Sequence, residues 1–122
     1  MRLVSDENRG SGISFRNLFF LMRYILSGTY RHVDVIPAFY VELARTNRRS
    51  ANVILKAYGR AVAEAISADS DHDLKAPESV RIDLILALMD ALTHHAPDGY
   101  RFGSTMGAVM HFGYIPIEDD FS

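Results

Sequence analysis

The chain has 122 residues, of which 48% are hydrophobic and 23% charged, and its formal net charge is -2. This length suits one domain with a single core, and the composition excludes a disordered or collagen-like chain. The sequence contains no cysteine, which excludes disulfides, thiolate nucleophiles and cysteine-based zinc sites. Its apolar runs are far shorter than the roughly 20 residues of a membrane span, so we expect a soluble protein of the cytoplasm.

The N-terminal quarter predicts a tail followed by a helix. Residues 1–12 are polar and lack periodicity, so we expect a flexible tail there and a single helical domain over residues 13–122. Apolar side chains at helical spacing predict a helix from about Ser14 to Ser27, with Gly28 just past its end. Phe20 and Tyr24 project away from the main apolar side of that helix and offer a second hydrophobic surface.

Two more helices follow. Asp34 is a suitable N-cap for the first of them, which tolerates a proline in its first turn. The second is predicted from Ser50 to about Ser67, with apolar residues on one side and a basic stripe on the other. The stripe consists of Arg48, Arg49, Asn52, Lys56 and Arg60. Such a stripe can follow a phosphate backbone, with the asparagine at a base edge, or it can be an ordinary solvated helix face.

A fourth helix is predicted over residues 77–95, between a polar loop and an Ala-Pro stop. Its apolar arc is unusually wide, so we expect it to lie at the centre of about four packed helices. Asp90, His94 and His95 near its end form a weak candidate for a metal site or an acid–base pair. Histidines at a helix C-terminus also interact favourably with the helix dipole, which is the simpler interpretation.

The stretch after residue 96 is rich in glycine and aromatic residues. It predicts a small irregular or β element, either a hairpin or a short helix over residues 104–111 followed by a strand, and periodicity does not decide between them. Aromatic and methionine side chains are enriched in the cores of protein interfaces. The predicted partner-binding residues are Phe20, Tyr24, Tyr100, Phe102, Met110, Phe112 and Tyr114.

The small net charge hides a strong asymmetry. Residues 1–60 carry ten lysines and arginines against four acids, a net +6, whereas residues 61–122 carry three against eleven, a net -8. Such polarity favours pairing between a basic and an acidic half as readily as an anionic ligand.

The leading hypothesis for function is a non-enzymatic protein that binds a protein partner or a second copy of itself as a homodimer, without cofactor or membrane. A nucleic-acid-binding protein that uses the basic stripe is the alternative, and a metal-dependent hydrolase is the second alternative.

Overall fold

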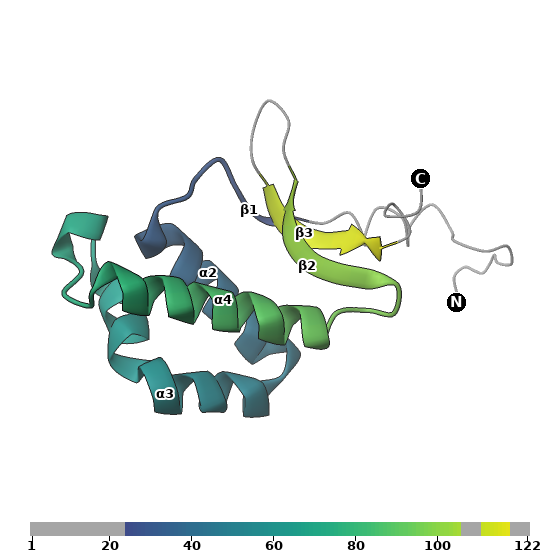
Figure 1. The fold of residues 1–122 in the computed structure, drawn as a ribbon, viewed down its shortest axis with the longest axis horizontal. Coiled ribbons are helices and arrows are strands. Elements are labelled where there is room, and N and C mark those ends of the chain that lie inside the picture. The colour runs from purple at the N-terminus through teal and green to yellow at the C-terminus, as the bar shows by residue number, and fades with distance from the viewer. Residues whose placement is uncertain (1–23, 106–110, 118–122) are drawn as a thin grey trace, which may run out of the picture.

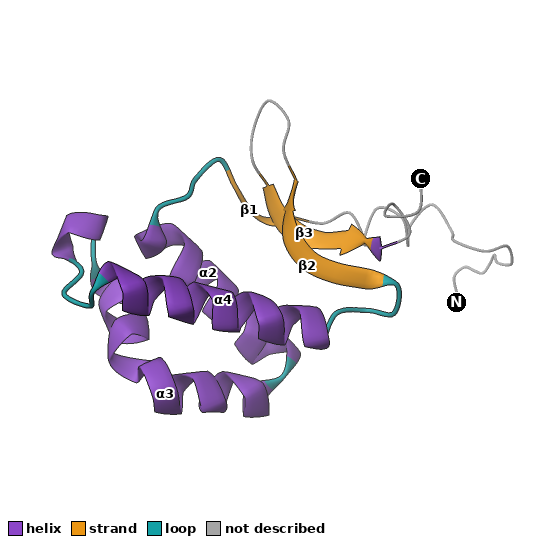
Figure 2. Cartoon of the chain, viewed as in Figure 1, coloured by secondary structure: helices purple, strands orange, loops and turns teal. Residues whose placement is uncertain are grey.

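The computed structural model describes residues 24–105 and 111–117 (Figure 1). The elements in chain order are β1 (Tyr24–Ser27), α2 (His32–Thr46), α3 (Arg48–Ser67), the short 3-10 turn η1 (Asp71–Asp73), α4 (Glu78–His94), β2 (Tyr100–Thr105) and β3 (His111–Pro116). The chain is mainly helical, with a small antiparallel sheet packed beside the helices (Figure 2). The predicted tail over residues 1–12 lies outside the described residues.

The prediction of four helices is wrong, because the described chain has three. Tyr24–Ser27, predicted as the end of a first helix, is strand β1, which pairs antiparallel with β3. Gly28 follows with a φ of 78°, a conformation that glycine adopts without strain, and turns the chain toward α2. The remainder of the predicted helix, residues 14–23, lies outside the described residues. Pairing with a strand more than 80 residues away decides the conformation here, and local periodicity carries no sign of it.

Helix α2 begins earlier than its sequence pattern predicts. Asp34, the predicted N-cap, lies inside the first turn, and Arg31 holds the N-cap position. The Asp34 carboxylate accepts hydrogen bonds from Thr29 Oγ1 and Arg31 Nε at 2.7 and 2.9 Å. It therefore fixes the approach of the chain to the helix without capping it.

The cap of α2 comes from η1. The carboxylate of Asp71 accepts hydrogen bonds from the backbone N–H groups of His32 and Val33 at 3.1 and 3.0 Å. Burial acts to raise the pKa of Asp71, but the two N–H donors, together with electrostatic attraction from His32 and Arg81, outweigh it and hold the pKa below its ordinary value of 3.8. Arg81 of α4 reaches His32 Nδ1 at 2.9 Å, so η1, α2 and α4 meet at this end of the molecule.

Helix α3 starts two residues before its predicted start, because Asn47 caps it by accepting a hydrogen bond from Ser50 N at 2.9 Å. The helix is kinked at Tyr58, whose φ and ψ of -132° and 21° are not helical. Gly59 follows this residue directly, and glycine weakens a helix interior. The kink therefore coincides with the weakest helix former in the segment.

The core lies where the helices meet the sheet. Helix α2 contacts α3, α4 and β1. Its Phe39 is fully buried and packs edge-on against Phe102 of β2 and Phe112 of β3, with ring centroids 4.9 and 5.2 Å apart. The large aliphatic side chains that are fully buried in the same core are Ile36 and Leu43 of α2, Val62 of α3, and Leu84, Leu88 and Leu92 of α4. Helix α4, predicted to lie at the centre, contacts α2, α3 and β2, but part of its apolar arc stays uncovered, since Ile82 and Leu86 are 43% and 58% exposed.

Of the two conformations that the sequence left open for the C-terminal segment, the described residues adopt the paired strands of a hairpin. Strands β2 and β3 pair antiparallel, with Gly103 opposite Gly113, and β3 is the central strand in the order β1-β3-β2. Phe102 and Tyr114 are cross-strand partners on the side of the sheet that faces α2. The alternation of side chains along each strand thus turns aromatic residues toward the core.

Candidate interaction surface

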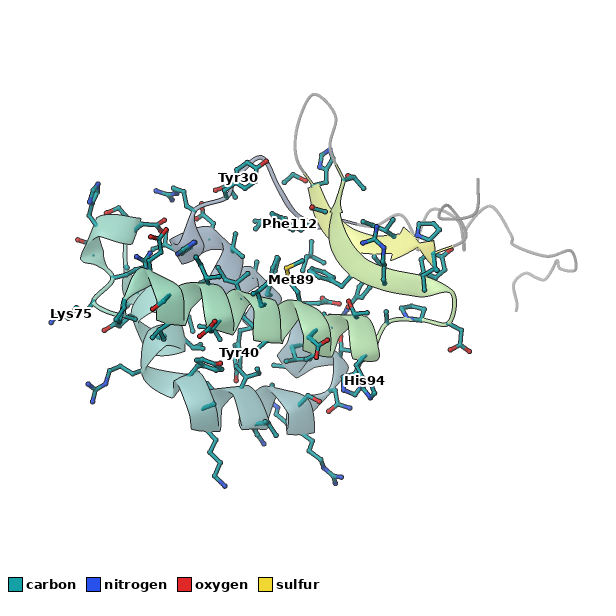
Figure 3. The ribbon with its side chains drawn as sticks, viewed as in Figure 1. Tyr30, Tyr40, Lys75, Met89, His94 and Phe112 are labelled. Carbon is teal, nitrogen blue, oxygen red and sulfur yellow. The ribbon has the colours of Figure 1, made fainter. Side chains whose placement is uncertain are left out.

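The aromatic residues predicted to bind a partner do not form an exposed surface in the described chain. Phe102 and Phe112 are only 3% and 9% exposed, because they pack on Phe39, and Tyr100 and Tyr114 are partly buried. Phe20 and Met110 lie outside the described residues, and of Tyr24 the structure describes the backbone alone, in β1. Figure 3 shows Phe112 between the sheet and the helices.

Tyr114 takes part in a buried polar contact that joins the sheet to α2. Its hydroxyl donates a hydrogen bond to Glu42 Oε2 at 2.8 Å, and Glu42 is 6% exposed. Arg45 Nη2 donates to the same oxygen at 2.7 Å and balances its charge. Burial and the neighbouring carboxylate together raise the pKa of Tyr114 to about 12. The arrangement holds β3 on α2.

The basic stripe is at the surface over its whole length. The side chains of Arg48, Arg49, Asn52, Lys56 and Arg60 are all exposed. Val53 lies among them and is 64% exposed. The one acid of α3, Glu64, turns away from the stripe and accepts hydrogen bonds from the backbone N–H groups of Lys75 and Ala76. Within the described residues, no cation of the stripe forms an ion pair. We call Arg49, Val53, Lys56 and Arg60 the outer α3 face.

Helix α4 presents a surface of the opposite charge. Ile82 and Leu86, four residues apart, lie on one side of the helix and are both exposed. Asp83 and Asp90 lie beside them and are exposed as well. The one arginine of α4, Arg81, donates instead to the carbonyl oxygen of Ala76. We call Ile82, Asp83, Leu86 and Asp90 the outer α4 face.

The two helices are antiparallel neighbours (Figure 1). Ser50 Oγ and His95 Nε2, 2.8 Å apart, join the start of α3 to the end of α4. At the other end, Glu64 of α3 binds the chain just before α4 begins. One basic and one acidic surface, each with exposed apolar side chains, are therefore carried by adjacent helices.

Two of the three weak metal candidates, His94 and His95, make other contacts. His95 is hydrogen-bonded to Ser50, and the ring of His94 packs edge-on against it, with centroids 4.9 Å apart (Figure 3). Asp90 is exposed on α4. Nowhere in residues 24–105 and 111–117 do three acidic or histidine side chains form a group that could hold a metal ion.

A shallow hollow of about 360 Å³ lies between the kink of α3 and the start of α4. Its lining includes Tyr58 and Gly59 of α3 and, from the start of α4 and the chain just before it, Lys75, Pro77 and Val80. Its polar lining combines two cations, Arg60 and Lys75, with the carboxylate of Glu64, which is already engaged. This lining favours no particular ligand.

Sequence reasoning missed the exposed apolar residues of α3 and α4. The apolar periodicity of α4 assigns Ile82 and Leu86 to its buried arc. No pattern in the sequence of α3 distinguishes Val53 as an exposed apolar residue. The available signal is the width of the apolar arc on α4, which exceeds what one modest core can cover.

Comparisons with known protein families, with curated proteins and with solved structures give no significant match to this chain. In the part of the chain that the structure describes, no helix combines the length and the apolar character needed to cross a membrane.

Proposed function

We propose that this chain is a non-enzymatic protein of the cytoplasm that binds another protein through its outer α3 and outer α4 faces. The observation that carries this proposal is the exposure of Val53 and Leu86, at 64% and 58%, in the middle of two charged helix surfaces. Apolar side chains surrounded by charged ones are typical of protein-binding surfaces, whose centres are apolar and whose rims are polar.

The energetics support a protein partner. Each square ångström of apolar surface removed from water contributes about 25 cal/mol, so burying two large aliphatic side chains offsets part of the cost of association. The charged residues around them bring specificity and faster association more than affinity. The predicted partner-binding role of Phe102 and Phe112 is not carried into this proposal, because both side chains lie in the core.

Capture from an extract of the source organism tests this function. The immobilised wild-type chain is compared with Val53→Asp and, separately, Leu86→Asp, and bound proteins are quantified by mass spectrometry. Val41→Asp is the matched control, since Val41 is 59% exposed on α2 and the change in charge is the same. We expect at least one captured protein, which can be the chain itself, whose captured amount falls about tenfold with each test variant. The control variant should capture the same amount of that protein as the wild type. If no protein behaves in this way, the proposed function is wrong.

The nucleic-acid alternative retains one favourable observation, the exposure of all five residues of the basic stripe. Against it, the acidic outer α4 face lies on the neighbouring helix and repels phosphate. Binding to random duplex DNA, measured at several salt concentrations, tests this alternative. If the wild type binds in a salt-dependent manner and the double variant Arg49→Glu, Arg60→Glu does not bind, nucleic acid is favoured over a protein partner. No observation in the described chain favours the metal-dependent hydrolase.

A further inference from the structure

We propose that the partner is a second copy of this chain, and that the outer α3 face of one copy packs antiparallel on the outer α4 face of the other. This inference rests on the proposed function and names its partner. It explains why one chain carries two unpartnered helix faces of opposite charge.

The spacing of the residues is the first argument. On α3, Arg49, Val53 and Lys56 follow one another at intervals of four and three residues. On α4, Asp83, Leu86 and Asp90 follow one another at intervals of three and four residues. When α4 is read backwards the intervals become identical. Both triplets span two helical turns, about 10.5 Å at 1.5 Å per residue.

An antiparallel pairing therefore matches all three positions in one register. Asp90 lies opposite Arg49, Leu86 opposite Val53, and Asp83 opposite Lys56. The apolar pair is buried between two ion pairs, which is the arrangement of a helix–helix seam with charged flanks. One helical turn beyond the pair of Val53 and Leu86, the small Ala57 lies opposite the large Ile82. The same register therefore leaves room for close packing of the two helices.

Exposure is the second argument. Val53 and Leu86 are the most exposed large apolar residues of their helices, and the four charged residues of the two triplets are exposed as well. Within one copy the charges do not neutralise one another, since no ion pair joins α3 to α4 in the described chain. Both surfaces are therefore available for a partner.

Charge is the third argument, and it selects the pairing. Helix α3 carries four cations and one acid, whereas α4 carries three acids and one arginine. Contact between two α3 faces or between two α4 faces brings like charges together and is disfavoured, whereas α3 on α4 is attractive. The contact is heterologous: two copies joined once still carry one free α3 face and one free α4 face, so we expect the average mass to keep rising with concentration.

Sedimentation analysis with charge-reversed variants tests this contact. Variant one carries Arg49→Glu and Lys56→Glu, and variant two carries Asp83→Lys and Asp90→Lys. Each variant alone brings like charges together, so we expect self-association to weaken at least about tenfold relative to wild type. An equimolar mixture restores complementary faces in both directions, and we expect it to associate as wild type does.

A control separates the contact from net charge. Asp73→Lys with Asp98→Lys changes the net charge as variant two does, at exposed positions outside both faces, and should leave association unchanged. Circular dichroism verifies that each variant is folded. Strictly monomeric wild type, variants that associate like wild type, or a mixture that stays monomeric would each overturn the inference. The chain can also prove monomeric while another protein is captured in amounts that fall with Val53→Asp and Leu86→Asp. In that case the proposed function stands, and only the inference that the partner is a second copy is refuted.

Discussion

Replacement of Phe39 by alanine is expected to lower the free energy of unfolding by about 3–5 kcal/mol, the usual cost of truncating a buried aromatic residue. Phe39 is fully buried and packs in T-shaped arrangements with Phe102 and Phe112. The substitution leaves a cavity where α2 meets the hairpin, so the loss combines apolar transfer with lost aromatic contacts. Urea unfolding followed by far-UV circular dichroism measures it.

The matched control lies on the same helix. Val41→Ala removes apolar atoms from a side chain that is 59% exposed, and should change stability by less than about 0.5 kcal/mol. Equal effects at Phe39 and Val41 would contradict the placement of the core between α2 and the sheet.

Tyr114→Phe should have the second-largest effect, a loss of about 1–2 kcal/mol at pH 7. The substitution removes the hydroxyl that donates to the Glu42 carboxylate at 2.8 Å. Hydrogen bonds to charged groups contribute about 1.5–3 kcal/mol, and the expected loss reaches below that range because the tyrosine is only partly buried and solvent weakens the contact. Urea unfolding of the two proteins gives the difference, and Tyr30→Phe, at a 63% exposed position, is the control.

Burial of Tyr114, together with its contact to Glu42, makes the free energy of unfolding depend on pH in the alkaline range. The pKa of Tyr114 is raised from 10.0 to about 12 in the folded chain, so folding favours the protonated hydroxyl. Its contribution is fully present below pH 10 and is lost as the pH rises through about 12. We expect the stability difference between wild type and Tyr114→Phe to shrink over this interval. A difference that stays constant from pH 8 to pH 12 would show that the hydroxyl is not held by Glu42.

The helices were largely predictable from sequence, because their signals are local. Helix α3 was predicted over 50–67 and observed as Arg48–Ser67, and α4 was predicted over 77–95 and observed as Glu78–His94. Apolar periodicity and the Ala-Pro stop lie within these segments themselves. The kink at Tyr58 was not predicted, since one glycine in a helical pattern is compatible with a straight helix.

The errors arise where distant segments meet. Strand β1 exists because Tyr24–Ser27 pairs with β3, and the N-terminus of α2 is capped by Asp71, which is 38 positions or more downstream of the N–H groups it binds. Phe102 and Phe112 were interpreted as surface residues because a hairpin and its buried side could not be assigned before the partner strand was known.

The candidate site was predicted in part. The basic stripe on α3 is exposed as its amphipathic pattern indicates. The complementary residues on α4 were hidden from sequence reasoning, because Leu86 belongs to an apolar arc and only packing shows which part of that arc is covered. The split of charge along the chain was compatible with pairing between its two halves and with an anionic ligand alike, and the structure describes a basic α3 beside an acidic α4.

Thiol cross-linking tests most directly whether α3 of one copy contacts α4 of another. The natural chain has no cysteine, so Val53→Cys and Leu86→Cys each introduce a single thiol. The two variants, one of them lengthened by a tag so that the covalent products differ in mass, are mixed and treated with a short bifunctional thiol reagent. The antiparallel contact predicts that the mixed 53–86 product dominates over both same-site products. Same-site products in equal or greater amount, or no covalent dimer at a concentration where the chain associates, would contradict it.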